Sequence, residues 1–216
     1  MEQSKNNNNS SIGSEQVSKE QLILQAAEAE FVSKGYAGAR TTSIAQAAGV
    51  THAMLHYYFR TKELLFKRIL QDKLTLMAQS FAGQFGSAGQ SYEDRLRQGI
   101  SSHFDFLAAH PELPRFIINE VLNNPERMND IRSTISSIAV PIMRNLQVSL
   151  DEAAERGEIV RIEVRDLMLD ILSMNVFLFL AMPIASHVFQ VEDMNAFLER
   201  RKEENIQLIL KRIQLK

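Results

Sequence analysis

The sequence predicts an all-α fold in which a small N-terminal domain of three helices precedes a larger helical domain. Three observations carry this prediction. Apolar residues recur three and four positions apart through most of the chain, no stretch alternates like a strand, and two short helical patterns flank Gly49. The chain has 216 residues, of which 45% are hydrophobic, so it can bury a proper core in one large or two small domains.

The N-terminal end lacks the pattern of a folded segment. Residues 1–16 are rich in Asn and Ser, and we expect them to form a disordered tail. A first helix is expected from Val17 to Lys34, because apolar residues there share one face. These residues are Leu22, Ile23, Ala26, Ala27 and Phe31.

A short helix is expected next, from about Thr42 to Ala48. Thr42 or Ser43 can accept hydrogen bonds from its free N–H groups. With Ser43 as the cap, Gln46 stands at the third helical position, which is the spacing of a capping box. Gly49 then ends the helix, because glycine readily adopts the left-handed conformation at a helix C-terminus.

A second short helix is expected from His52 to Tyr58, with Thr51 as its cap. Leu55 and Phe59 lie four residues apart, so both can anchor this helix on one side. Two short helices joined by three or four residues that include glycine are typical of a helix-turn-helix. In that motif the second helix lies in the DNA major groove, with its N-terminal residues against base edges.

Five outward side chains of the second helix offer hydroxyl, imidazole and methyl groups, which suit base edges and phosphate oxygens. They are Thr51, His52, Ala53, His56 and Tyr57. The alternative is an ordinary amphipathic helix with a solvated polar face. The charge distribution favours DNA, because residues 34–68 hold six basic residues and one acidic residue, a local charge of +5. From residue 71 onward there are 16 basic and 20 acidic residues, a charge of -4.

The segment from about Lys19 to Leu70 resembles the DNA-binding domain of the tetracycline-repressor (TetR) family of bacterial transcription regulators. The matching residues are Phe31, Gly35, Tyr36, Thr41, Thr42, Ile44, Ala45, Ala48, Gly49, Val50, Leu55, Tyr58, Phe59, Lys62, Glu63 and Leu65. The family often has Lys-Gly or Arg-Gly where this chain has His52 and Ala53, so we expect a different base preference. Thr42, Tyr57 and Lys62 resemble the family's phosphate-contacting positions. The predicted DNA-binding residues are Thr42, Thr51, His52, Ala53, His56, Tyr57, Tyr58 and Lys62.

We therefore expect a DNA-binding domain at residues 17–70 and a ligand-binding and dimerisation domain at residues 71–216. A long fourth helix should begin after Thr61, as its cap, and continue to about Phe81, so that it belongs to both domains. Gly83, Gly86 and Gly89 predict a flexible connection. Further helices are expected at about 91–109, 113–122, 125–156, 163–188 and 193–213. Pro141 should kink or split the third of these, and Gly157 should end it.

The segment Glu163–Val188 is apolar almost all round, which predicts burial on several sides. Asp170, Asn175 and Pro183 within it disfavour a membrane helix. This segment and the last helix, from each of two subunits, could form a four-helix dimer bundle, the arrangement that the resemblance also implies. A monomer with a thick core is the alternative. The predicted dimer-interface residues are Leu178, Phe197, Ile206, Ile209 and Ile213.

Residues 91–190 are expected to enclose a cavity for a largely apolar small molecule with one or two polar groups. The candidate ligand-binding residues are His103, Phe104, Leu107, Phe116, Asn119, Glu120, Met143, Gln147, Met174 and Phe177. The alternative is that these side chains form ordinary core, since Met and Phe at helical spacing are common there.

Enzymatic and metal-binding functions are disfavoured. His52 and His56 have the spacing of a zinc-binding pair, but Ala53 stands where a His-Glu-x-x-His peptidase needs Glu, and no third ligand is evident. We expect no catalytic residue, no metal site and no cofactor. The lack of cysteine and of an apolar core in the first residues favours the cytoplasm.

The expected function is a transcription repressor that binds a palindromic operator as a homodimer and is released by a small, largely apolar inducer. Two alternatives come from other classes. One is a helical small-molecule or metal-binding protein without DNA function, and the other is a helical enzyme.

Overall fold

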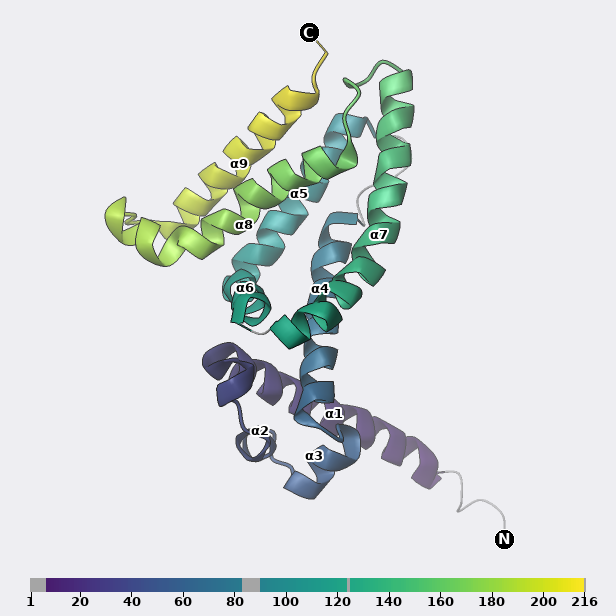
Figure 1. Ribbon diagram of the computed structural model, residues 1–216, viewed down its shortest axis with the longest axis vertical. Coiled ribbons are helices and arrows are strands. Elements are labelled where there is room, and N and C mark those ends of the chain that lie inside the picture. The colour runs from purple at the N-terminus through teal and green to yellow at the C-terminus, as the bar shows by residue number, and fades with distance from the viewer. Residues whose placement is uncertain (1–6, 83–89, 124, 216) are drawn as a thin grey trace. The chain divides into compact units, whose positions relative to one another are not determined.

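The computed structural model describes residues 7–82, 90–123 and 125–215, and in these ranges every regular element is an α-helix (Figure 1). The all-α prediction is confirmed. The chain divides into two compact units, Met1–Lys73 and Leu74–Lys216, which are described separately below. The glycines expected to form a flexible connection lie outside the described residues.

The N-terminal unit contains α1 (Asn7–Gly38), α2 (Thr41–Ala47), α3 (His52–Tyr58) and the first part of α4 (Lys62–Ala82). Helix α1 begins at Asn7, ten residues before the predicted start at Val17. No proline interrupts this stretch, so nothing in its backbone chemistry stops the helix before Val17. Gly35, with φ 65° and ψ 174°, breaks the regular helix next to the predicted end at Lys34.

Three aromatic rings pack together in the N-terminal unit. Phe31 and Tyr36 from α1 both meet Phe66 of α4 edge to face, with ring centroids 5.2 and 5.1 Å apart. At the edge of this core, Lys73 Nζ lies 2.6 Å from Glu28 Oε1 and so pairs α4 with α1. These contacts hold α1 against α4, and α2 packs on α1 in turn.

The C-terminal unit contains the rest of α4 and five further helices. They are α5 (Tyr92–Ala109), α6 (Leu113–Asn123), α7 (Pro125–Glu155), α8 (Val164–Val188) and α9 (Met194–Ile213). The expected ranges are confirmed to within about one residue at most ends. Helix α7 continues through Pro141, so this proline does not split it. Gly157, at φ 71°, follows the end of α7 as expected.

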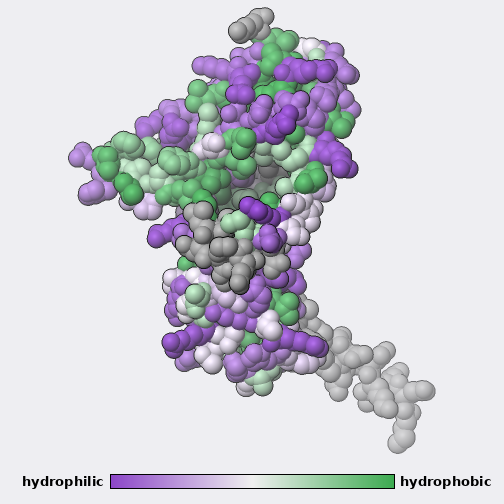
Figure 2. All heavy atoms as spheres, in the orientation of Figure 1, coloured by the Kyte–Doolittle hydropathy of each residue, from purple (hydrophilic) through white to green (hydrophobic). Residues whose placement is uncertain are grey.

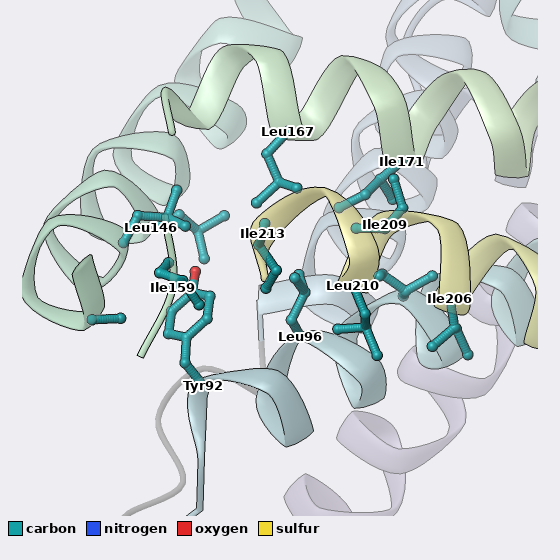
Figure 3. Close-up of a cluster of buried hydrophobic side chains, with 13 residues drawn as sticks. Tyr92, Leu96, Leu146, Ile159, Leu167, Ile171, Ile206, Ile209, Leu210 and Ile213 are labelled. Carbon is teal, nitrogen blue, oxygen red and sulfur yellow. The ribbon is translucent and has the colours of Figure 1, made fainter. Parts of the chain in front are cut away.

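Helices α5, α8 and α9 pack together, and α7 closes one side of their core (Figures 1 and 3). The core side chains shown in Figure 3 are Tyr92, Leu96, Leu146, Ile159, Leu167, Ile171, Ile206, Ile209, Leu210 and Ile213. All of them are at most 3% exposed.

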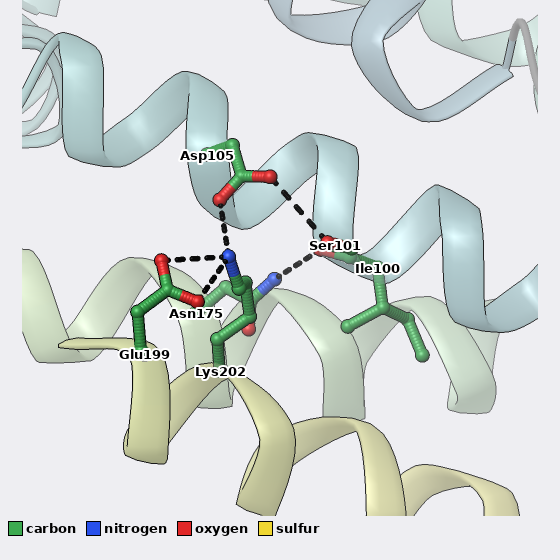
Figure 4. A network of polar contacts seen from close by, with 6 residues as sticks. All are labelled: Ile100, Ser101, Asp105, Asn175, Glu199 and Lys202. Carbon is green, nitrogen blue, oxygen red and sulfur yellow. Dashed lines mark hydrogen bonds and ion pairs between the residues drawn. The ribbon is translucent and has the colours of Figure 1, made fainter. Parts of the chain in front are cut away.

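The interior of the C-terminal unit also contains a row of hydrogen-bonded polar groups. Asn175 Nδ2 of α8 donates to the Ile100 carbonyl at 3.3 Å and lies 3.2 Å from His103 Nδ1, both on α5. Asn205 Nδ2 of α9 donates to Asn175 Oδ1 at 3.0 Å. Nearby, Lys202 of α9 pairs with Asp105 of α5 and with Glu199 (Figure 4). Directional bonds of this kind fix the position of each of the three helices along the length of its neighbours.

Burial corrects three of the predicted dimer-interface residues. Ile206, Ile209 and Ile213 lie in the chain's own core, at 3%, 1% and 1% exposure, so they have no surface left to offer a partner. Leu178 is half-buried against the neighbouring Phe104 and Phe179. Periodicity finds the apolar face of α9 but cannot say whether that face meets its own subunit or another.

Helix α8 carries several exposed apolar side chains. Phe177, Ile184 and Val188 share one stripe of this helix at 67%, 73% and 63% exposure. Figure 2 shows hydrophobic residues gathered at the left of the view, around the C-terminal end of α8. By length and composition alone α8 is also apolar enough to cross a membrane, which is weak evidence because core helices pass the same test. Asp170 is paired with Arg212 at 3.0 Å, and Asn175 is fully buried by neighbouring helices.

Candidate nucleic-acid interface

Helix α3 is held against α2 by its apolar side. Leu55 is fully buried and Phe59 nearly so, as the spacing of these two residues predicted. Ile44, Ala45 and Ala48 contribute the facing apolar surface from α2 and the turn after it. Because this side is packed, the opposite side of α3 is presented to solvent in a fixed orientation.

The turn between α2 and α3 is built from backbone hydrogen bonds. Gly49 has φ 66°, and its N–H donates to the Gln46 carbonyl at 3.1 Å. The Val50 N–H donates to the Ala45 carbonyl at 3.0 Å, and this pair of bonds closes the end of α2. Thr51 Oγ1 accepts from the Met54 N–H at 3.1 Å, which confirms Thr51 as the cap of α3.

The cap of α2 differs from the prediction. The N-cap residue is Arg40, whose side chain makes no capping bond, and neither Thr42 nor Ser43 has that role. Instead, the Arg40 N–H donates to Glu30 Oε1 of α1 at 3.1 Å. A carboxylate from another helix therefore accepts a backbone hydrogen bond at the start of α2. Sequence spacing cannot reveal this contact, because ten residues separate the two groups.

The predicted DNA-binding residues lie together at the exposed side of this unit. Thr42, Thr51, His52, Ala53, His56 and Tyr57 are exposed, while Tyr58 and Lys62 are half-buried. Tyr58 meets the Tyr57 ring edge to face at 5.5 Å. Lys62 Nζ lies 4.5 Å from the centroid of the Tyr36 ring, a cation–π contact that holds the ammonium at the edge of the domain.

Two histidines on α3 form part of a continuous line of contacts. His52 Nε2 lies 3.0 Å from Thr41 Oγ1 on α2. The His52 and His56 rings meet edge to face, with centroids 4.4 Å apart. His56 Nδ1 lies 3.2 Å from the carbonyl oxygen of Arg60, in the turn before α4. Sequence reasoning found the histidines as candidates but missed Thr41, because its role depends on the angle between α2 and α3.

The local positive charge is lower than the residue count suggests. Lys34 is paired with Glu30 at 2.8 Å, and Arg68 is paired with Asp72 at 2.9 Å. The hydrogen bond from Lys34 is the main reason that the pKa of the Glu30 carboxyl is lowered. The i,i+4 spacing of Glu30 and Lys34 was the available signal in the sequence.

The candidate ligand-binding residues differ in their burial. His103, Phe104, Leu107, Phe116 and Glu120 are buried. Met143, Gln147 and Met174 are half-buried, and Asn119 and Phe177 are exposed, which is contrary to the expectation that all ten point inward. Gln147 is engaged structurally, since its Oε1 accepts from the Val164 N–H at 2.7 Å. Burial lowers the pKa of His103 to about 4, so this imidazole is neutral.

A groove of about 450 Å³ lies between α8 and α9. Its apolar lining includes Met174 and Phe177 from α8 and Phe197 from α9. Arg200, Arg201 and Glu204 form its charged edge, and the Arg200 guanidinium lies 5.6 Å from the Phe197 ring centroid. Phe197 was predicted at a subunit contact, whereas the charged edge was missed because isolated charges on α9 resemble a solvated face.

Comparison with known proteins identifies both parts of the chain. Residues 23–69 match the family model described as "Bacterial regulatory proteins, tetR family". Residues 93–209 match the model described as "Tetracyclin repressor-like, C-terminal domain". Together these two matches cover the candidate interface and most of the C-terminal unit.

Individual proteins are similar over shorter or more divergent stretches. The HTH-type transcriptional repressor SCO4008 of Streptomyces coelicolor is 34% identical over 98 residues, 45% of this chain and 47% of that protein. The HTH-type transcriptional repressor NicS of Pseudomonas putida is 28% identical over 125 residues, 56% of this chain and 58% of that protein. The chain thus spans about half the length of these relatives.

A solved structure extends the likeness to nearly the whole fold. The transcriptional regulator FadR of Bacillus subtilis, solved in complex with stearoyl-CoA, has a TM-score of 0.64 to this chain at 21% identity. The match covers 90% of this chain and 99% of that protein.

Proposed function

Since the chain belongs to the TetR family of bacterial regulatory proteins, we propose that it is a repressor that binds a palindromic operator as a homodimer and is released by a small molecule. The single observation that carries the DNA-binding part is the exposed side of α3. It presents hydroxyl and imidazole groups on a helix whose other side is anchored by Leu55 and Phe59. Such a helix can enter a major groove without rearranging.

Positioning and reading fall to different residues in this proposal. Thr42, Tyr57 and Lys62 contact phosphates, while Thr51, His52, Ala53 and His56 face base edges. Lys62 supports this division because its ammonium is held over the Tyr36 ring at the edge of the domain rather than on the exposed side of α3. Phosphate contacts give affinity that is independent of sequence, and base contacts give the preference for one operator.

The homodimer is proposed to form through α8 and the groove beside α9. Phe177, Ile184, Val188 and Phe189 are each more than 60% exposed in the single chain. A contiguous apolar surface of this kind is typical of a protein interface. The two-fold symmetry of a dimer would also place two α3 helices on the two halves of a palindrome. This face replaces the α9 isoleucines that periodicity favoured.

The inducer is proposed to be largely apolar with one or two polar groups, and to bind in the C-terminal unit. Buried His103 and Glu120 lie among aromatic and aliphatic side chains there, so an amphipathic molecule would find both kinds of contact. Stearoyl-CoA bound to FadR supports this class of ligand, because that protein has a similar fold. No cofactor is needed for such a mechanism, and the protein would act in the cytoplasm, where its operator lies.

Release from DNA requires that the inducer prefer one conformation of the dimer. A ligand shifts an equilibrium only by its difference in affinity for the two states. Helix α4 is the proposed connection, because it runs without a break from Lys62 to Ala82 and so belongs to both units. A change at its C-terminal half would alter the spacing of the two α3 helices.

Footprinting of the purified protein on the DNA upstream of its own gene tests this function. We expect protection of a palindrome whose half-site centres lie about one helical turn or slightly more apart, roughly 34–36 Å being the usual unit. Light scattering on the same preparation should give a dimer. Protection of one asymmetric half-site by a monomer, or no protection at any concentration, would refute the proposal.

A further inference from the structure

The two histidines on the exposed side of α3 are held by different kinds of partner. His52 contacts a threonine hydroxyl, which can either donate or accept a hydrogen bond. His56 contacts the backbone carbonyl of Arg60, which can only accept. The second contact therefore determines which ring nitrogen carries the proton, whereas the first does not.

The proton of His56 must lie on Nδ1. At 3.2 Å from the Arg60 carbonyl oxygen, Nδ1 is the donor of this hydrogen bond. In the neutral imidazole the other nitrogen, Nε2, then has a lone pair and no proton. His56 is exposed, so this lone pair is available to a molecule that approaches α3.

The orientation of the ring is also restricted. The His52 ring meets the His56 ring edge to face at 4.4 Å, and His52 is itself held by Thr41. The contact of His52 with Thr41 and that of His56 with the Arg60 carbonyl thus limit rotation of the two imidazole rings before any DNA is present. A group that is already oriented loses less conformational entropy on binding, so its hydrogen bond discriminates better between bases.

Resting on the proposed operator binding, we propose that His56 reads an exocyclic amino group in the major groove, N6 of adenine or N4 of cytosine. These are the only hydrogen-bond donors that bases present in that groove. Guanine presents O6 and N7, and thymine presents O4, all of which are acceptors. An acceptor at Nε2 cannot form a hydrogen bond with these atoms, because both partners carry a lone pair and the two repel. Guanine and thymine are therefore disfavoured at the position that His56 meets.

The test is selection of bound duplexes from a library with a randomised central region. The wild-type chain should select adenine or cytosine at one position of each half-site. His56→Phe keeps a ring against His52 but has no acceptor, so the preference at that position alone should fall, by roughly two- to tenfold per half-site. His56→Arg has only donors and should change the selected base to guanine.

His52→Phe is the matched control, since it removes the neighbouring imidazole from the same exposed side. It should alter a different position and leave adenine or cytosine as the base selected where His56 reads, although the strength of that preference can fall. If His56→Phe leaves every position unchanged, or if the position it affects is guanine in the wild type, the inference is overturned while operator binding stands. If the wild-type chain enriches no palindrome at all, the proposed function itself fails. Circular dichroism of both variants checks that they are folded.

Discussion

Thr41 Oγ1 and His52 Nε2 lie 3.0 Å apart, which joins the first turn of α2 to the first turn of α3. The two residues belong to the two helices of the helix-turn-helix, so their contact forms only when the turn at Gly49 sets the correct angle. The contact orients an imidazole at the start of α3, on the side that is exposed. The base preference of this chain should therefore depend on a threonine that does not itself lie on α3.

Thr41→Val should weaken the discrimination between operators while leaving most non-specific binding in place. Valine has nearly the shape of threonine but no hydroxyl, so the His52 ring loses its partner. The expected loss is about 1 kcal/mol of preference at the position that His52 meets. Binding to a panel of single-base operator variants measures it. Thr41→Ser keeps the hydroxyl and should retain the preference; an equal loss for all duplexes with Thr41→Val would instead assign Thr41 to a phosphate contact.

Lys62→Ala should weaken binding to every DNA sequence alike. Its ammonium is held over the Tyr36 ring, at a position that resembles a phosphate contact. Removing one phosphate contact per subunit should reduce the slope of log K against log salt by about 0.9 per subunit. Titrations at several salt concentrations measure this slope, and Lys62→Arg should restore it. Because Lys62 also packs on Tyr36, the melting temperature of each variant needs to be compared with the wild type.

Ile209→Asp and Phe177→Asp should fail in different ways. Ile209 is 1% exposed in the core of its own subunit, so an aspartate there should destabilise the fold by about 4 kcal/mol or more. Phe177 is 67% exposed on α8, so its substitution should leave the subunit folded and prevent dimerisation. Light scattering and urea unfolding distinguish the two results.

Val148→Asp provides the control for these variants, because Val148 is 55% exposed on α7 and does not line the groove. It should remain a folded dimer. A dimeric Phe177→Asp protein that still binds operator would exclude the proposed contact through α8.

Acidification should destabilise the C-terminal unit through His103. Burial lowers the pKa of His103 from 6.5 to about 4, so between these values the unfolded chain binds a proton that the folded chain does not. Stability is therefore present above about pH 6.5 and is lost as the pH falls toward 4. From pH 7 to about pH 5 the expected loss is about 2 kcal/mol.

Urea unfolding of wild type and His103→Asn at both pH values measures this contribution. The asparagine Oδ1 can still accept from Asn175 Nδ2, as His103 Nδ1 does, but it does not titrate. The variant should lose about 2 kcal/mol less than the wild type over the same interval. Equal losses in the two proteins would mean that His103 does not contribute to the pH dependence.

Local interactions explain why so much of the secondary structure could be predicted. The bounds of α3, its cap at Thr51 and the left-handed Gly49 all depend on residues within four positions of one another. Side chains and backbone groups this close are in contact in any helix, whatever the rest of the chain does. The same locality let the sequence indicate which side of α3 is buried and which is exposed.

Contacts between distant residues were decided only by tertiary structure. The Glu30 carboxylate serves the start of α2, Thr41 holds His52, and Asn205 meets Asn175 in the core, although no sequence spacing joins these pairs. The α9 isoleucines were assigned to the wrong neighbour for the same reason. Periodicity determines that one side of a helix is apolar, but the free energy of burial is the same whether the covering surface comes from its own subunit or a partner. Only the packing of α5, α7, α8 and α9 shows which apolar side chains are buried within the subunit and which stay exposed to solvent.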